Sequence, residues 1–261
     1  MLKRPRGCCA GLLSLSIYAG GILAATPDVP ADVAAAVADA RRPAAQVKDD
    51  ATRRPGLALA FSGVKSGDRV ADFMPGNAYY TRILSRVVGA TGHVYAFIPE
   101  EQVAHCAPAE IVGTRAIQHD PAYANVTVLT RPLAHFHLPE PLDLLWTAQN
   151  YHDLHDTFLG PANVAALNNA FFNALKPGGV FLVIDHVAEA GSGLRDTETL
   201  HRIDPIRMRV EIESAGFVFD SQSDILRNDD DDHRRTVFDS FIRGKTDQVI
   251  FKFRKPGGVG T

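Results

Sequence analysis

Polar residues of the kinds that bind ligands and move protons are concentrated in one stretch, Gln149–Asp156, which follows the apolar run Leu142–Thr147. The apolar run has the length of a buried strand. His152 is the best candidate for a general base because the ordinary pKa of histidine lies near neutrality. Asn150 and Tyr151 can orient a bound molecule through an amide and a hydroxyl group. We interpret the stretch as a substrate loop; a loop with only structural hydrogen bonds is the alternative.

The same stretch also offers metal chemistry. His152 and His155 are three residues apart, so they share one face of a helix, and Asp153 and Asp156 lie beside them. Imidazole and carboxylate groups suit zinc, copper or iron. No two blocks of the sequence show the paired spacing of a structural metal site. We therefore assign no metal ligands and keep a transition-metal site as an alternative.

A second place where chemistry is expected is the turn Asp72–Ala78, which begins within the last residues of the expected buried strand Arg69–Met74. Gly76 lacks a Cβ atom and lets the backbone approach a ligand closely. Asp72 ends a buried strand, where a carboxylate is unfavourable unless it meets donors or cations. The helix expected after the turn supplies free amide groups at its N-terminus. The turn therefore predicts a ligand site, although Asp-x-x-x-Gly alone is a common pattern.

The elements that would position these residues alternate along the chain. Strands are expected at Arg69–Met74, His93–Ile98, Val126–Arg131, Leu142–Thr147 and Gly179–Val187, and helices at Leu57–Phe61, Tyr79–Val88, Glu100–Ala107 and Pro161–Leu175. This order predicts an α/β domain with a mostly parallel sheet covered on both faces. A helix at Arg207–Ala215 and strands at Phe217–Ile225 and Gln248–Arg254 predict a terminal antiparallel hairpin. In such a sheet ligands bind at the carboxyl ends of the strands, where Asp185 and His186 also lie.

The two ends of the chain differ from this domain. Residues 1–25 have a basic head, a short apolar middle and small residues before a turn, which is typical of a cleavable export signal. We expect an exported protein with a helical lead-in at 26–52, one domain at 53–255 and a flexible tail at 256–261. No later segment is long and apolar enough to span a membrane, so no stable insertion is expected after cleavage. A formal net charge of −3 gives no reason to expect nucleic acid, and no oligomeric state is assigned. The run Asp229–Asp232 is interpreted as a solvated loop.

Three blocks in this order resemble the motifs of class I S-adenosylmethionine-dependent methyltransferases: Gly67–Thr81, Leu142–Trp146 and Leu175–His186. Leu-Lys-Pro-Gly-Gly within the third block is the most specific piece. The chain also resembles a group of exported bacterial proteins described as predicted methyltransferases, whose C-terminal pattern is similar to Ala215–Phe217 and Thr246–Pro256 here. The resemblance implies a three-layer, Rossmann-like sheet that is mostly parallel with a C-terminal antiparallel strand.

The resemblance also implies roles for particular residues. S-adenosylmethionine would be the cofactor and a small molecule the methyl acceptor. The catalytic residues would be His152 and Asn150. The cofactor would be held by Asp72, Met74, Gly76, Asn77 and Glu100, and the acceptor by Tyr151, Asp185 and His186.

The chain departs from the family pattern at three places. Met74 and Ala78 stand where the family has glycine, and Ile98 or Pro99 stands where it has the acidic residue that holds the ribose; Glu100 follows as a substitute. These departures and the export signal favour a rival interpretation, a catalytically inactive binding module for a small ligand or a transition metal in the periplasm. A dinucleotide-dependent reductase fits poorly because the Gly-x-Gly-x-x-Gly pattern is absent.

Overall fold

The computed structural model describes residues 28–160 and 162–257. The predicted export signal therefore lies outside the described residues, as does most of the predicted tail. Within the described part of the chain, no helix is both long and apolar enough to cross a membrane.

Seven strands form one sheet in the order β3-β2-β1-β4-β5-β7-β6. The strands are β1 (Arg69–Phe73), β2 (His93–Pro99), β3 (Val126–Arg131), β4 (Leu142–Ala148), β5 (Leu175–His186), β6 (Val218–Ser223) and β7 (Gln248–Arg254). Strands β1 to β5 pair in parallel, whereas β7 runs antiparallel to both β5 and β6. The predicted α/β fold with an antiparallel strand at the C-terminal end is confirmed.

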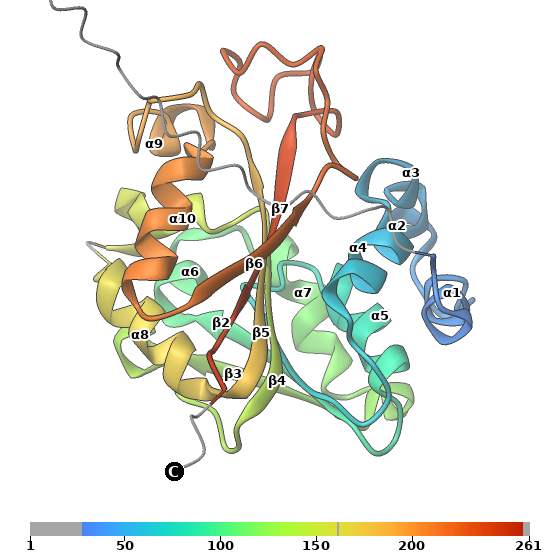
Figure 1. The fold of residues 1–261 in the computed structure, drawn as a ribbon. Coiled ribbons are helices and arrows are strands. Elements are labelled where there is room, and N and C mark those ends of the chain that lie inside the picture. The colour runs from blue at the N-terminus through green and yellow to red at the C-terminus, as the bar shows by residue number, and fades with distance from the viewer. Residues whose placement is uncertain (1–27, 161, 258–261) are drawn as a thin grey trace, which may run out of the picture.

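Helices cover both faces of the sheet (Figure 1). The helices are α1 (Ala31–Val37), α2 (Ala44–Lys48), α3 (Asp50–Arg53), α4 (Pro55–Ser62), α5 (Tyr79–Val88), α6 (Glu100–His105), α7 (Pro108–Ile117), α8 (Val164–Ala174), α9 (Thr197–Leu200) and α10 (Pro205–Ser214). Short 3₁₀ helices are η1 (Pro121–Tyr123), η2 (Leu133–His135), η3 (His152–His155) and η4 (Thr157–Leu159). Two apolar clusters fill the space on the two faces: one joins α1, α4 and α5 to the sheet, and the other joins α8 and α10 to it.

Local chemistry explains where several elements begin. Helix α8 begins at Val164 rather than at the predicted residue 161 because the Asn163 side chain caps it by accepting from the Ala166 amide. Helix α10 begins two residues earlier than predicted, since Asp204 caps it and Pro205 suits its first position. Strand β5 begins at Leu175, four residues before the predicted start.

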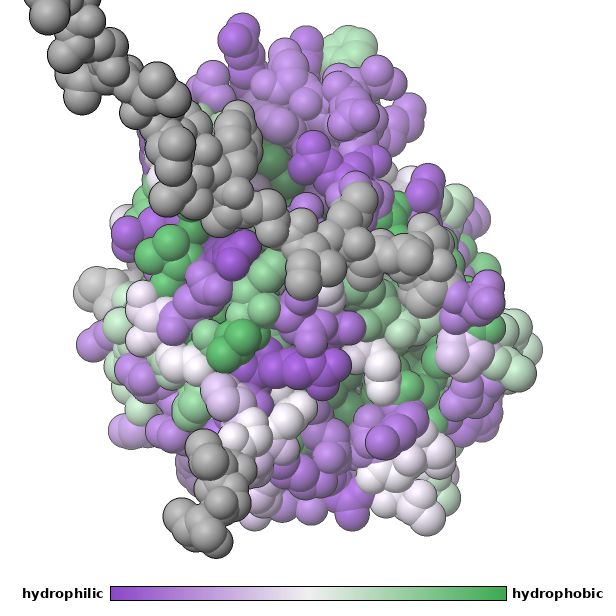
Figure 2. Space-filling view, viewed as in Figure 1, coloured by the Kyte–Doolittle hydropathy of each residue, from purple (hydrophilic) through white to green (hydrophobic). Residues whose placement is uncertain are grey.

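The segment between β6 and β7 lies over the edge of the sheet where the parallel strands end, at the top of Figure 1. Figure 2 shows that its outer surface is mostly hydrophilic. The interpretation of Asp229–Asp232 as a wholly solvated loop is nevertheless wrong for Asp231, which is 5% exposed. Its carboxylate pairs with the fully buried Arg202 at 2.8 Å and accepts from the Asp247 amide.

Candidate functional site

The turn after β1 has an unusual backbone. Met74, Gly76 and Ala78 have φ angles of 55°, 54° and 61°, in the left-handed region. The Met74 amide donates to the Phe97 carbonyl at 2.9 Å, and the Ala78 amide donates to Pro75. Left-handed backbone costs a residue with a Cβ roughly 1–2 kcal/mol. The chain therefore keeps a turn that suits glycine at three positions, although only one of them is glycine.

Asp72 lies at the end of β1 and is 3% exposed. Its Oδ2 atom accepts a hydrogen bond from the Thr81 hydroxyl at 2.6 Å. Burial raises the pKa of Asp72 to about 7, because the hydrogen bonds from Thr81 offset only part of the desolvation. A cationic ligand group at this point would favour the ionised form.

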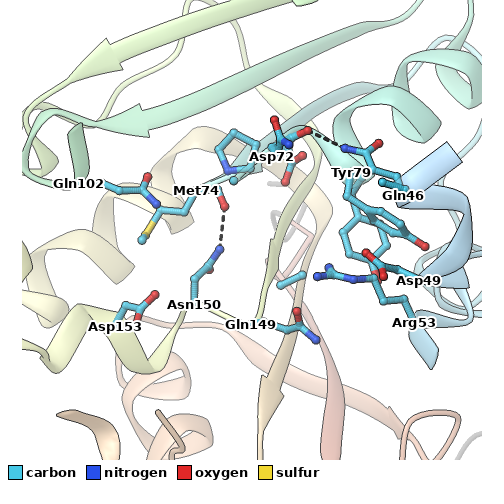
Figure 3. Close-up of a pocket in the computed structure, with 16 residues that line it drawn as sticks. Gln46, Asp49, Arg53, Asp72, Met74, Tyr79, Gln102, Gln149, Asn150 and Asp153 are labelled. Carbon is cyan, nitrogen blue, oxygen red and sulfur yellow. Dashed lines mark hydrogen bonds between the residues drawn. The ribbon is translucent and has the colours of Figure 1, made fainter. Parts of the chain in front are cut away.

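A cavity of about 380 Å³ opens beside this turn (Figure 3). Its size is within the usual range for small-molecule sites. The wall includes Gln46, Asp49, Arg53, Asp72, Met74, Gly76, Asn77, Tyr80, Gln102, Gln149, Asn150 and Asp153. Phe97 is absent from the wall because its ring is buried in the core, 5.8 Å from the ring of Phe73. The site is therefore open to a ligand and is not filled by this aromatic side chain.

The helices before the domain form one wall of the cavity. The Gln46 amide in α2 donates to the Asn77 carbonyl at 2.7 Å, which ties the lead-in to the turn. Asp50 joins the same segment to α5, since it pairs with Arg42 at 2.6 Å and accepts from the Tyr79 hydroxyl at 2.6 Å. Sequence reasoning missed Gln46 and Arg53, because nothing in an Ala-rich charged segment indicates which of its side chains will face a cavity.

The other two predicted cofactor residues, Asn77 and Glu100, both have exposed side chains. The Asn77 side chain is exposed and accepts from the Gly113 amide at 2.6 Å, so it braces helix α7. Glu100 is exposed at the first position of α6 and does not line the cavity. Gln102, two residues further along the helix, does line it. Its Oε1 atom is buried and has no hydrogen-bond partner in the described part of the chain.

Asn150 lies in the cavity wall with its polar atoms already engaged. Its Nδ2 atom donates to the Met74 carbonyl at 2.8 Å (Figure 3), and its Oδ1 atom accepts from the Thr147 hydroxyl. The side chain thus joins the end of β4 to the turn after β1. This geometry suits a positioning role rather than direct proton transfer.

His152 is 2% exposed and does not line the cavity. Its Nδ1 atom lies 2.8 Å from Asp185 Oδ1, and its Nε2 atom lies 3.1 Å from Asp153 Oδ1. Burial alone would lower the pKa of His152, but the two carboxylates raise it well above its ordinary value. A protonated, fully paired imidazole has no free lone pair, so the predicted role of general base does not fit this structure.

Tyr151 and Asp185, which were predicted to bind the acceptor, are also buried away from the cavity. The Tyr151 hydroxyl lies between the Asn168 amide at 2.8 Å and Glu211 at 3.3 Å. Asp185 is fully buried and accepts from the His152 backbone amide at 2.8 Å. Both residues hold the structure behind the site instead of facing a ligand.

His186 has a different environment. It lines a second cavity of about 460 Å³, which adjoins the first one because Asp49, Arg53 and Gln149 line both. Its Nδ1 atom lies 2.7 Å from the Thr246 hydroxyl. Burial, and then the positive charges of His152 and Arg202, lower the pKa of His186 well below its ordinary value. His186 is therefore a neutral imidazole at a cavity wall, as a proton acceptor must be.

This architecture is shared with proteins of known structure. No protein-family model matches the sequence, and no curated protein matches it. Among solved structures, a SAM-dependent methyltransferase from Aquifex aeolicus superimposes with a TM-score of 0.55 and 17% identity, over 84% of this chain and 97% of that one. The chain has the Rossmann-like methyltransferase fold. The glycopeptide N-methyltransferase MtfA, solved with S-adenosylmethionine, gives 0.52 and 15% over 79% and 87%.

The [4+2]-cyclase SpnF also superimposes, with a TM-score of 0.58 and 15% identity over 84% of this chain and 85% of that one. A protein named for cyclisation therefore shares the architecture with methyltransferases. The fold does not by itself determine the reaction. The function of this chain therefore has to be inferred from the residues around the two cavities.

Proposed function

We propose that the protein is an exported S-adenosylmethionine-dependent methyltransferase that acts on a small molecule. The observation that carries the proposal is the cavity at the end of β1. It combines the left-handed turn with a buried carboxylate, Asp72, and an unpartnered amide oxygen on Gln102. The fold and the motif resemblance support this choice. We keep Asp72, Met74, Gly76 and Asn77 as proposed cofactor residues, because all four line this cavity.

The charges in the cavity suit the amino-acid end of the cofactor. Asp72 offers a carboxylate to the α-ammonium group, and Arg53 offers a guanidinium group to the α-carboxylate. Gly76 presents bare main chain to the nucleoside. Gln102 lines the cavity, and its amide oxygen has no partner in the described residues, so we assign to its side-chain amide the ribose contact that was predicted for Glu100.

Bound S-adenosylmethionine would supply an electrophilic methyl group on its sulfonium. The protein's contribution is alignment of the acceptor and removal of its proton. Asn150 holds the turn at the Met74 carbonyl and thereby shapes the cofactor site. His186 is the candidate proton acceptor, because its Nδ1 is engaged by Thr246 and its ring is neutral at the wall of the adjoining cavity.

Isothermal titration of the purified protein with S-adenosylhomocysteine tests the proposal. Gln102→Ala should weaken binding about two- to tenfold, since a neutral hydrogen bond contributes about 0.5–1.5 kcal/mol. Glu100→Ala is the matched control on the same helix and should bind like the wild type. If the folded protein shows no binding at millimolar ligand, the proposal fails. Equal losses in both variants would remove the assignment of Gln102.

The rival is the binding module without catalysis. It is favoured by one observation, the strained Met74 and Ala78 at positions where the family has glycine. Binding of the cofactor product without methyl transfer to any of a panel of small acceptors would support the rival. Export is tested separately by the location of a tagged chain and by the mass of its mature N-terminus.

A further inference from the structure

Four side chains gather behind the cavity wall, from two segments that are far apart in the sequence. His152, Asp153 and Asp156 come from η3 and the residue after it, and His201 comes from the end of α9. One ligand atom from each lies within 4.8 Å of the corresponding atoms of the others. The predicted partner His155 is not among them, because its Nε2 atom pairs with Glu211 at 3.0 Å.

Asp156 is the member of this cluster that most needs an explanation. It is 2% exposed, and both of its carboxylate oxygens lack a hydrogen-bond partner in the described part of the chain. The His201 Nδ1 atom lies 3.8 Å from its Oδ2 atom. A buried carboxylate without donors is strongly unfavourable unless it is neutralised. The two oxygens face a cluster that contains two imidazoles and a second carboxylate.

The surroundings hold these groups in the arrangement that a metal site requires. Asp185 binds the Nδ1 side of His152, which directs Nε2 at the cluster; metal-ligating histidines commonly have such a carboxylate behind them. The Arg202 guanidinium is anchored by Asp231 and by the Val187 carbonyl at 2.9 Å, and this fixes the chain beside His201. His201 itself has a φ angle of 55°.

We propose that His152, Asp153, Asp156 and His201 form a binding site for one divalent transition metal, with zinc as the best match. Two imidazoles and two carboxylates are a suitable set for zinc in tetrahedral coordination. Metal–ligand distances of about 2.0–2.2 Å place ligand atoms about 3.4 Å apart in such a site. The ligand atoms of the cluster are at most 4.8 Å apart, so the longest separation has to shorten by about 1.4 Å at most to reach that geometry. The proposal does not depend on the proposed methyltransferase activity.

The site would lie directly beside the cofactor cavity, because Asp153 belongs to both. Figure 3 shows Asp153 next to Asn150 at the cavity wall. The metal would bind His152 at Nε2 and hold η3 against α9. It would therefore neutralise Asp156 and keep the wall of the cavity in place.

Metal binding to the purified full-length chain provides the test. After removal of metal with a chelator, titration with Zn²⁺ against a chromophoric competitor should give one equivalent, and Co²⁺ should give the visible absorption of a four-coordinate site. Asp156→Asn and His201→Gln should each lower Zn²⁺ affinity at least tenfold. Asp185→Asn, behind His152, should lower it about 10- to 100-fold.

His155→Gln is the matched control, because His155 lies on the same short helix but outside the cluster. It should bind Zn²⁺ like the wild type. Thermal unfolding with and without Zn²⁺ gives a second readout, and His201→Gln, at a partly exposed position, guards against a variant that fails to fold. Absence of stoichiometric binding in the wild type would overturn the proposal. Unchanged affinity in Asp156→Asn and His201→Gln would overturn it as well.

Discussion

At the scale of single residues, the protonation of a buried histidine depends on the charged groups around it. His152 has the residue type of a base, yet two carboxylates hold it protonated. His186 has the same type but is kept neutral by burial and by neighbouring positive charge. The sequence shows both histidines equally well. It does not show which carboxylates will surround each of them. We therefore propose for His186 the proton-acceptor role that the sequence predicted for His152.

Asp72 should make the stability of the protein depend on pH. Its pKa is raised on folding from 3.8 to about 7, so the folded state holds the proton more tightly and the free energy of unfolding falls as the pH rises through this window. Between pH 5 and pH 8 the wild type should lose about 2–3 kcal/mol more than Asp72→Asn. Urea unfolding at the two pH values measures this; parallel profiles for the two proteins would contradict it.

At the scale of elements, the turn between β1 and α5 carries the cofactor proposal. A substitution at Gly76, where the backbone is left-handed, has two possible costs: contacts of the new Cβ atom with its neighbours, and the conformational cost of the positive φ angle. In Gly76→Ala the new Cβ meets only the Glu110 carbonyl, at 4.0 Å, so the protein's own packing hardly opposes it. The conformational cost of about 1–2 kcal/mol remains.

Gly76→Ala should therefore lower the free energy of unfolding by about 1–2 kcal/mol and, in addition, weaken S-adenosylhomocysteine binding, since the methyl group would occupy ligand space. Gly63→Ala is a matched control: Gly63 has a φ of 78°, its Cβ would meet nothing within 4 Å, and it lies outside the cavity wall. The control should show a similar loss of stability with unchanged affinity. Equal affinities in the two variants would argue against a ligand on the turn.

For the lead-in helices, the sequence predicts the type of element but not its contacts with the rest of the domain. The sequence predicts a helical lead-in at 26–52, and α1, α2 and α3 lie at residues 31–53. Their role as a wall of the cavity was not expected. It depends on the contact of Gln46 with Asn77, which joins residues 31 positions apart.

At the scale of the whole molecule, the segment between β6 and β7 is fixed to the domain by the buried pair of Arg202 and Asp231. Removing one partner of a buried ion pair leaves an uncompensated charge and costs about 3–5 kcal/mol. Asp231→Ala should therefore lower the free energy of unfolding by about that amount. Asp229→Ala, two residues away in the same acidic run and almost fully exposed, should change it by less than about 1 kcal/mol.

Denaturant unfolding of the two variants measures this difference. A small effect for Asp231→Ala would mean that the segment is held by other contacts. If both variants were strongly destabilised, the loop as a whole would matter rather than the ion pair.

The sequence alone was sufficient to predict the order and type of most strands and the edge of the sheet at which the cavity opens. Hydrophobic periodicity and turn residues are local properties, and β3, β7 and α5 have the predicted bounds. The place of Asp72 and Gly76 at the end of β1 followed from the same local signals.

Only the tertiary structure decided which polar groups meet. Gln102 replaced Glu100 at the cavity because a helix turns each residue by about 100°, so two positions along α6 face different directions. His201 replaced His155 in the histidine–carboxylate cluster because α9 folds against η3, and no spacing in the sequence records that contact. Pairing between distant segments depends on packing of the whole chain, which periodicity cannot supply.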